Sequence, residues 1–245
     1  DNTDSRGASW GDYDNDGDLD LFVANIDDEN NFLYRNDGGS SFSRITTGPV
    51  VNDGGSSQGG SWGDYDNDGD LDLFVTNVIS TRKNFLYKNN GDGTFNKITD
   101  GDIVNDKGSS RGSSWGDYDN DGDLDLFVAN INGSNFLYRN DRDLGFQKIT
   151  ESKIVKDSLN SRSGSWCDYD NDGDLDLVVI NFDGKILLYR NEGNSNHWIN
   201  TYLVGTLSNT SAIGAKIRLK ATIGGQALWQ LSLIHISEPT RPTLI

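Results

Sequence analysis

The chain has 245 residues, which is enough for one or two domains with a sizeable hydrophobic core. It contains 29 glycines and only 3 prolines, a composition that favours an all-β protein with many tight turns. The formal net charge of −17 excludes the basic footprint of a nucleic-acid-binding protein, and no stretch of the sequence is long and apolar enough to span a membrane.

The negative charge is concentrated in four copies of one nine-residue stretch, Asp-Tyr-Asp-Asn-Asp-Gly-Asp-Leu-Asp. Each copy carries five aspartates, so the four copies hold 20 of the 38 acidic residues. The rest of the chain has 18 acidic residues against 21 basic ones, a net charge of +3. The acidity therefore belongs to four local loops and not to a solvating surface.

The first repeat consists of short runs of β-branched and aromatic residues bounded by turn formers, which predicts strands. Helical periodicity of 3.6 residues is absent throughout the chain. In chain order the repeat comprises a small-residue run at 5–9, Trp10-Gly11, the acidic stretch at 12–20, and apolar runs at 21–25, 31–36 and 42–46.

Four tryptophans mark the period of the repeat. Trp10, Trp62, Trp115 and Trp166 are spaced by 52, 53 and 51 residues. This period is too long for helical-hairpin repeats and fits four short strands, as in a propeller blade. The predicted fold is therefore all-β: a β-propeller fragment of four roughly 52-residue blades over 1–192, with a partial β-rich C-terminal domain after it.

The fourth copy is less complete than the other three. Its apolar runs lie at 177–179 and 186–191, a fourth strand is not clearly present, and a different pattern begins after Gly193.

The acidic stretches have the composition of calcium loops. Aspartates at positions 1, 3, 5, 7 and 9 bring oxygen ligands round one point, and the glycine at position 6 allows the sharp turn. We expect side-chain ligands at positions 1, 3, 5 and 9 and a backbone carbonyl at position 7. The predicted ligands, for about one Ca²⁺ per loop and four in all, are Asp12, Asp14, Asp16, Asp18, Asp20, Asp64, Asp66, Asp68, Asp70, Asp72, Asp117, Asp119, Asp121, Asp123, Asp125, Asp168, Asp170, Asp172, Asp174 and Asp176.

Two alternatives to calcium are a solvated acidic turn and a magnesium site. Four identical copies at regular spacing argue against surface decoration, because clustered carboxylates repel unless a cation or protons neutralise them. Magnesium fits less well, since it retains its waters and needs fewer carboxylates.

The residue at position 12 excludes an EF-hand or a dockerin. Those loops need a bidentate acid at that position and flanking helices. Here the position is occupied by an apolar residue within a predicted strand, namely Val23, Val75, Val128 or Val179.

The nine-residue stretch resembles the Asp-x-Asp/Asn-x-Asp-Gly-x-x-Asp loop of FG-GAP or VCBS repeats, the calcium loop of integrin-like propellers. The resemblance covers roughly residues 1–192. The segment 193–230, with Asn196-His197-Trp198-Ile199 and 212–217, resembles a truncated ASPIC/UnbV domain of the cartilage acidic protein-like family, although Thr210 stands where an arginine is usual. This resemblance implies a secreted, periplasmic or cell-surface protein, and propellers of this kind commonly close with seven blades.

The two ends of the sequence look incomplete. The chain contains no methionine and begins without a signal-peptide pattern, which suggests that N-terminal sequence is missing. Residues 231–245 begin Leu-Ser-Leu-Ile-His-Ile-Ser-Glu-Pro-Thr-Arg, which resembles the translation of a transposase sequencing adapter. We expect this segment to be non-native; the alternative is a genuine C-terminal strand.

Several other residues recur once per blade. The tryptophans and the tyrosines Tyr34, Tyr87, Tyr138 and Tyr189 are expected to pack between blades and not to serve as ligand platforms. Cys167 replaces a glycine of the other copies and is expected to be a small buried residue. One further position carries Arg6, Gln58, Arg111 and Arg162, which either line an axial channel and bind an anionic ligand or form a polar rim.

No catalytic constellation is recognisable. His197 and His235 are the only histidines, and no nucleophile or base is paired with either. We therefore expect no enzyme activity and no catalytic residues. The predicted function is calcium-dependent adhesion or binding of an extracellular protein or glycan. The alternatives are the non-catalytic propeller of a larger secreted carbohydrate-active enzyme, or a structural surface-layer component.

Overall fold

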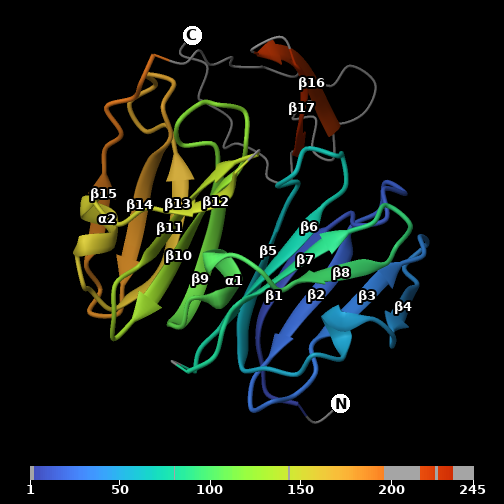
Figure 1. Ribbon diagram of the computed structural model, residues 1–245. Coiled ribbons are helices and arrows are strands. Elements are labelled where there is room, and N and C mark those ends of the chain that lie inside the picture. The colour runs from blue at the N-terminus through green and yellow to red at the C-terminus, as the bar shows by residue number, and fades with distance from the viewer. Residues whose placement is uncertain (1–2, 80, 143, 196–215, 224–225, 234–245) are drawn as a thin grey trace, which may run out of the picture.

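The computed structural model describes residues 3–79, 81–142 and 144–195, and the backbone alone of 216–223 and 226–233. Four antiparallel sheets follow one another along the chain, and within each sheet the strands lie side by side in sequence order. Figure 1 shows the sheets side by side in chain order, with β4 at one edge and β15 at the other. The predicted all-β, propeller-like fold is confirmed.

The first three sheets have four strands each and the last has three. The first comprises β1 (Ser5–Gly11), β2 (Asp20–Asn25), β3 (Phe32–Asn36) and β4 (Phe42–Ile45). The second comprises β5 (Ser57–Gly63), β6 (Asp72–Asn77), β7 (Phe85–Asn89) and β8 (Phe95–Ile98). The third comprises β9 (Ser109–Gly116), β10 (Asp125–Ile131), β11 (Phe136–Asp141) and β12 (Gly145–Lys148). The fourth comprises β13 (Ser161–Cys167), β14 (Asp176–Asn181) and β15 (Ile186–Tyr189).

Each acidic stretch is the connection of the first hairpin of its blade. In the first blade Gly11 pairs with Asp20, and in the second Gly63 pairs with Asp72. Because both ends of each stretch are held in the ladder, the nine residues must close into a compact loop. Strands and not helices flank every loop, as the apolar residue at position 12 predicts.

The hydrophobic core lies between neighbouring blades. One cluster joins Phe22 of the first blade to Leu73 and Val75 of the second, and equivalent clusters join the second blade to the third and the third to the fourth. Tyr87 and Tyr138 are fully buried, which confirms their predicted packing role. Each blade therefore depends on its neighbour to bury its apolar face.

The glycine after each tryptophan is explained by this blade packing. A Cβ atom at Gly11 would lie 2.8 Å from the Trp62 ring of the next blade, and one at Gly63 would lie 2.8 Å from the Trp115 ring. The indole of Trp62 also stacks on Tyr13, with centroids 6.2 Å apart. Cys167 is a free cysteine and is half-buried, less than the burial expected from the sequence.

Three single turns of helix connect successive blades, which the absence of helical periodicity did not predict. They are η1 (Pro49–Val51), α1 (Asp102–Asn105) and α2 (Lys153–Lys156). Each has three or four residues, too few for a 3.6-residue pattern to emerge. Each places one or two aliphatic side chains, such as Ile103 and Val104, in the core between blades.

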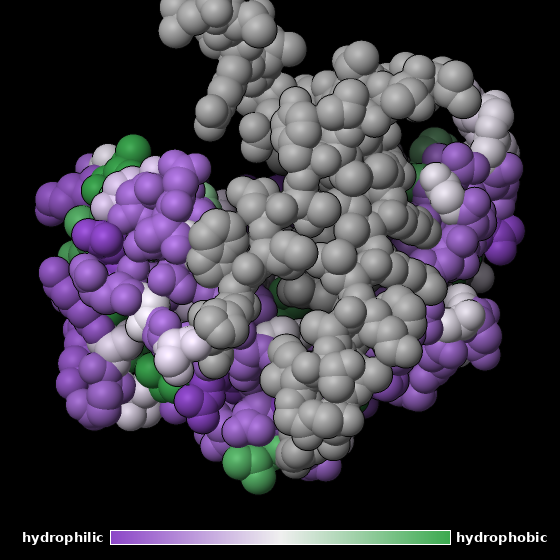
Figure 2. Space-filling view, turned by 90° about the horizontal axis from the view of Figure 1, so that it is seen from above, coloured by the Kyte–Doolittle hydropathy of each residue, from purple (hydrophilic) through white to green (hydrophobic). Residues whose placement is uncertain are grey.

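After the fourth blade the structure describes one hairpin, β16 (Lys216–Ile223) with β17 (Gln226–Leu233). The predicted ASPIC/UnbV-like segment and the segment at 231–245 lie mostly outside the described residues, so both remain predictions. Seen from above, the described surface is largely hydrophilic (Figure 2). Among the described residues no helix is long and apolar enough to cross a membrane.

Candidate metal centres

The aspartate at position 9 anchors each loop to the sheet. Asp20, Asp72, Asp125 and Asp176 begin the second strand of their blades, and all four are fully buried. In the second blade one carboxylate oxygen of Asp72 accepts the Tyr65 N–H at 3.1 Å, and the other accepts the Asn89 N–H at 2.8 Å. The same pair of contacts recurs in the other three blades. Position 9 therefore fixes the loop to the third strand.

The aspartate at position 1 shapes the turn. Asp64 accepts the Asp68 N–H and the Gly69 N–H, each at 3.0 Å. The asparagine at position 4 and the glycine at position 6 both adopt the left-handed conformation, with φ of 58° at Asn67 and 98° at Gly69. Asn and Gly are the residues that tolerate this conformation, so the Asn-Asp-Gly run folds the chain back on itself.

Positions 1, 3 and 9 converge on one point in every loop. In each of the four triads one carboxylate oxygen per residue lies within 4.8 Å of the other two. The triads are Asp12, Asp14 and Asp20; Asp64, Asp66 and Asp72; Asp117, Asp119 and Asp125; and Asp168, Asp170 and Asp176. The acidic side chains at positions 5 and 7 lie outside these triads.

The position 3 carboxylate of each triad contains a buried oxygen. Oδ1 of Asp14, Asp66 and Asp170 is shielded from solvent and has no hydrogen-bond partner among the described residues. A buried carboxylate oxygen without a donor is costly, since desolvation is not offset by any contact. The same atom is buried without a hydrogen-bond donor in three separate loops, so these residues fit a hard cation bound by oxygen ligands.

Burial raises the pKa of the position 9 carboxyl in the first three loops. The pKa rises to about 7 at Asp20, about 8 at Asp72 and about 9 at Asp125. Burial is the main cause; hydrogen bonds from the backbone oppose the rise, and neighbouring aspartates add to it. In the absence of a cation, folding thus forces these groups towards the protonated form.

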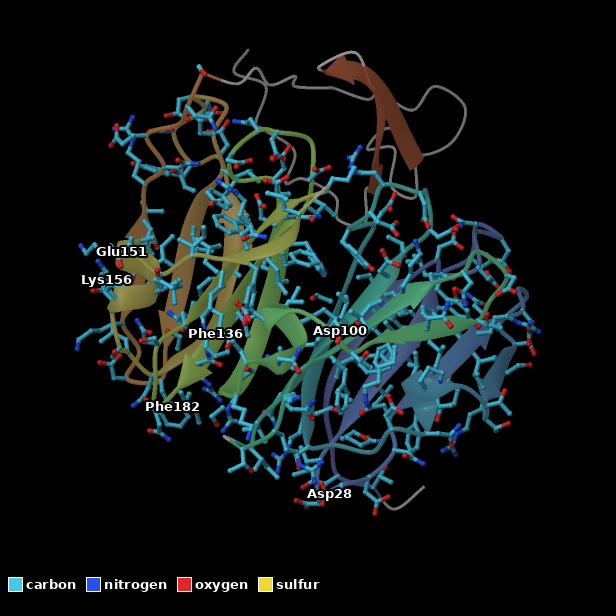
Figure 3. All side chains as sticks on the ribbon, in the orientation of Figure 1. Asp28, Asp100, Phe136, Glu151, Lys156 and Phe182 are labelled. Carbon is cyan, nitrogen blue, oxygen red and sulfur yellow. The ribbon has the colours of Figure 1, made fainter. Side chains whose placement is uncertain are left out.

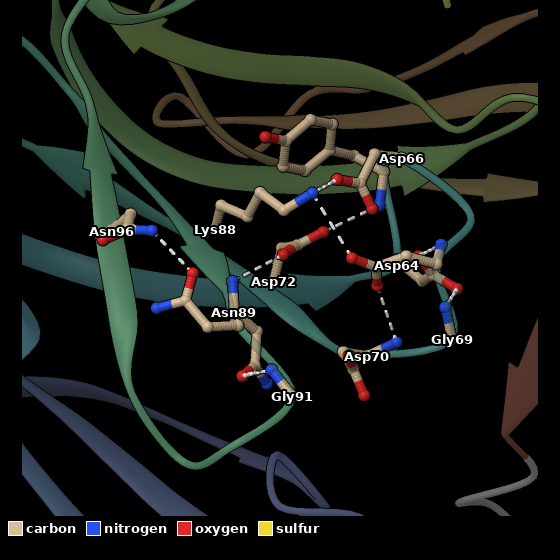
Figure 4. A network of polar contacts seen from close by, with 12 residues as sticks. Asp64, Asp66, Gly69, Asp70, Asp72, Lys88, Asn89, Gly91 and Asn96 are labelled. Atoms are coloured by element: carbon tan, nitrogen blue, oxygen red, sulfur yellow. Dashed lines mark hydrogen bonds and ion pairs between the residues drawn. The ribbon is translucent and has the colours of Figure 1, made fainter.

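In two of the loops, a basic side chain in the third strand or directly after it approaches the carboxylates of positions 3 and 5. In the second blade the Lys88 ammonium pairs with Asp66 and lies 3.3 Å from Asp68 (Figure 4). In the fourth blade Arg190 lies 3.0 Å from Asp170 and 3.5 Å from Asp172. These cations neutralise part of the charge at positions 3 and 5.

Two asparagines at each interface between blades contact the acidic loop of the neighbouring blade, a role that sequence reasoning missed. At position 4, Asn15 donates to Asp70 at 2.6 Å, and Asn67 and Asn120 donate to Asp123 and Asp174 at 2.9 and 2.7 Å. The position 7 carboxylate thus serves the contact between blades. At the end of the third strand, the Asn89 side chain donates to the carbonyl of Tyr13 at 2.7 Å. Both asparagines recur at the same two positions of the repeat, and this recurrence is the sequence signal that could have revealed their role.

These features define a propeller-type repeat protein with one acidic loop per blade. Family comparison agrees: the chain belongs to the FG-GAP-like repeat family, whose model matches residues 12–75, 76–128, 117–179 and 168–216.

Two curated relatives are both named cartilage acidic protein 1. The Xenopus tropicalis protein is 30% identical over 140 residues, covering 56% of this chain and 19% of that protein. The Homo sapiens protein is 27% identical over 245 residues, covering 92% of this chain and 36% of that protein. The chain thus spans about a third or less of the relatives it matches.

Among solved structures, the crystal structure of BBS1N in complex with ARL6DN matches with a TM-score of 0.44 and 12% identity. The match covers 93% of this chain and 64% of that chain.

Proposed function

We propose that this chain is a calcium-binding propeller module of a secreted or surface protein, and that it binds an extracellular protein or glycan without catalysis. The observation that carries the calcium assignment is the buried, donor-free Oδ1 at position 3 of the loops, beside the carboxylates of positions 1 and 9. In the second blade Asp64, Asp66 and Asp72 would hold the ion, with position 5 and the position 7 carbonyl as predicted further ligands.

The calcium would be structural. Its charge would replace the protons that burial otherwise forces onto the triad, and it would lock the turn that joins the first two strands. Because Tyr13 and Asn15 of one loop contact the next blade, an ordered loop also orders the interface between blades. Millimolar calcium outside cells suits sites of this kind.

The extracellular setting and ligand-binding role rest on the family and on the relatives' name, cartilage acidic protein 1. The VCBS-type description of the repeats and the ASPIC/UnbV-like identity of 193–230 belong to the same proposal. A rigid arc of blades carrying exposed loops is a scaffold on which binding surfaces commonly form.

Thermal melting in a chelator, in calcium and in magnesium tests the metal assignment. We expect the melting temperature to rise with millimolar calcium and to rise less with magnesium at the same concentration. An equal rise with both ions would contradict the calcium assignment. Arrays of extracellular glycans and matrix proteins, probed with calcium-loaded and chelated chain, test the ligand-binding role; it fails if no ligand shows calcium-dependent binding.

A further inference from the structure

A row of polar side chains crosses the first strands of the blades, well away from the acidic loops. The row consists of Arg6 on β1, Gln58 on β5, Arg111 on β9 and Arg162 on β13. These first strands contact one another in chain order. Their backbones come close at this level: a Cβ atom at Gly112 would lie 3.0 Å from the Arg162 carbonyl oxygen.

The row is poorly neutralised. Arg111 donates to the Gln58 side-chain oxygen at 2.6 Å, and the Arg162 guanidinium lies 4.9 Å from the centre of the Phe182 ring. Within the described part of the chain neither Arg111 nor Arg162 has a carboxylate in ion-pair range. Arg6 alone pairs with an acid, Asp4, at 3.0 Å on the exposed surface.

The arginines also act on one another. Burial lowers the pKa of Arg111, and the charges of Arg162 and Arg6 lower it further, so all three guanidinium groups share one local field. The nearest acidic loop begins six residues along the strand from Arg6, about 20 Å at the rise of a β-strand. That exceeds the Debye length of about 8 Å at physiological ionic strength, so the loops do not neutralise the row.

We propose that Arg6, Arg111 and Arg162, with Gln58, form an oxyanion-binding site on the inner strands of the propeller, suited to a sulfate group. Guanidinium groups present paired N–H donors that match tetrahedral and planar oxyanions, and Arg162 and Arg111 have these donors available. A sulfate could come from the free anion or from a sulfated sugar. The site deepens the proposed ligand-binding function and rests on it for its extracellular setting.

The test is calorimetric titration of the calcium-loaded chain at constant ionic strength. The probes are sodium sulfate, a sulfated disaccharide and the same disaccharide without sulfate. We expect the sulfated sugar to bind and the unsulfated sugar not to bind. Binding of inorganic sulfate alone would support the site and identify the free anion as its ligand. No binding by either sulfated probe to a folded, calcium-stabilised chain overturns the site and leaves the calcium proposal intact.

Variants locate the binding. Arg111→Ala and Arg162→Ala should each weaken sulfate binding about tenfold, as expected for loss of a charge-assisted hydrogen bond. Arg82→Ala is the charge-matched control. Arg82 pairs with Asp28, and Asp28 lies at the same end of the molecule as Phe182 (Figure 3).

The control should bind within twofold of the parent chain. Equal weakening in Arg82→Ala would show a general charge effect and refute the site. Arg162 is exposed, so its variant should fold even if Arg111→Ala does not.

Discussion

Replacing Asp72 with asparagine separates the metal role of a loop from its packing role. The side chain keeps its size and loses its charge, at a position that is fully buried and begins β6. Asp72 accepts two backbone N–H groups, from Tyr65 and Asn89, one on each oxygen. An asparagine has only one acceptor oxygen, so one buried N–H loses its partner, at about 1–3 kcal/mol.

In calcium the same substitution also removes a ligand of the proposed ion. A site held at 100 times its dissociation constant contributes about 2.7 kcal/mol to stability, most of which is lost when affinity falls a hundredfold. We therefore expect Asp72→Asn to reduce the free energy of unfolding by about 1–3 kcal/mol in chelator and by about 3–5 kcal/mol with calcium at 100 times its dissociation constant.

Urea denaturation with and without calcium measures both values. The control is Asp183→Asn, a change at an exposed turn aspartate that accepts only the Lys185 N–H among backbone donors. It should cost less than about 0.5 kcal/mol in either condition. If Asp72→Asn costs the same with and without calcium, Asp72 is a packing residue and not a metal ligand.

Three further predictions concern the blade interface and the loop charge. In Gly63→Ala the new Cβ would lie 2.8 Å from the Trp115 ring, so urea denaturation should show a free energy of unfolding lowered by about 1–3 kcal/mol. The control is Gly133→Ala, where nothing lies within 4 Å of the new Cβ and the free energy of unfolding should hardly change. Similar losses in both variants would refute the packing argument. Since the pKa of Asp72 is raised to about 8, the folded metal-free chain holds protons that the unfolded chain releases near pH 4. The stability of the metal-free chain should therefore fall as the pH rises from 4 to 8. Calcium binding at pH 7 should release protons, which calorimetric titration in two buffers of different ionisation enthalpy would show. A calcium affinity that does not change from pH 6 to 8 would contradict this prediction. Lys88→Gln removes a positive charge beside Asp66 and Asp68, so calorimetry should show a severalfold higher calcium affinity at one site. A lower calcium affinity at that site would mean that Lys88 helps to build it.

The blades and the triads were accessible from sequence because their signals are local. A period near fifty residues and four identical loops fix which segments form hairpins, and Gly11 opposite Asp20 closes the loop wherever the strands pair. Closing the loop brings the carboxylates of positions 1, 3 and 9 together.

The contacts between blades were not accessible in the same way. Asn15 and Asp70 are 55 residues apart, and only the packing of two blades brings them together. The same packing explains Gly11, where the absence of a side chain makes room for Trp62. The prediction that position 5 supplies a side-chain ligand stays untested: the Asp16 carboxylate accepts the Asp18 N–H at 2.9 Å and lies outside its triad.

Calorimetric titration of calcium into metal-stripped chain, with melting followed in parallel, shows whether the four loops are structural calcium sites. We expect about four ions to bind per chain and the melting temperature to rise as they bind. A chain that is folded without metal and binds no calcium would contradict this expectation, and the acidic loops would then be solvated turns.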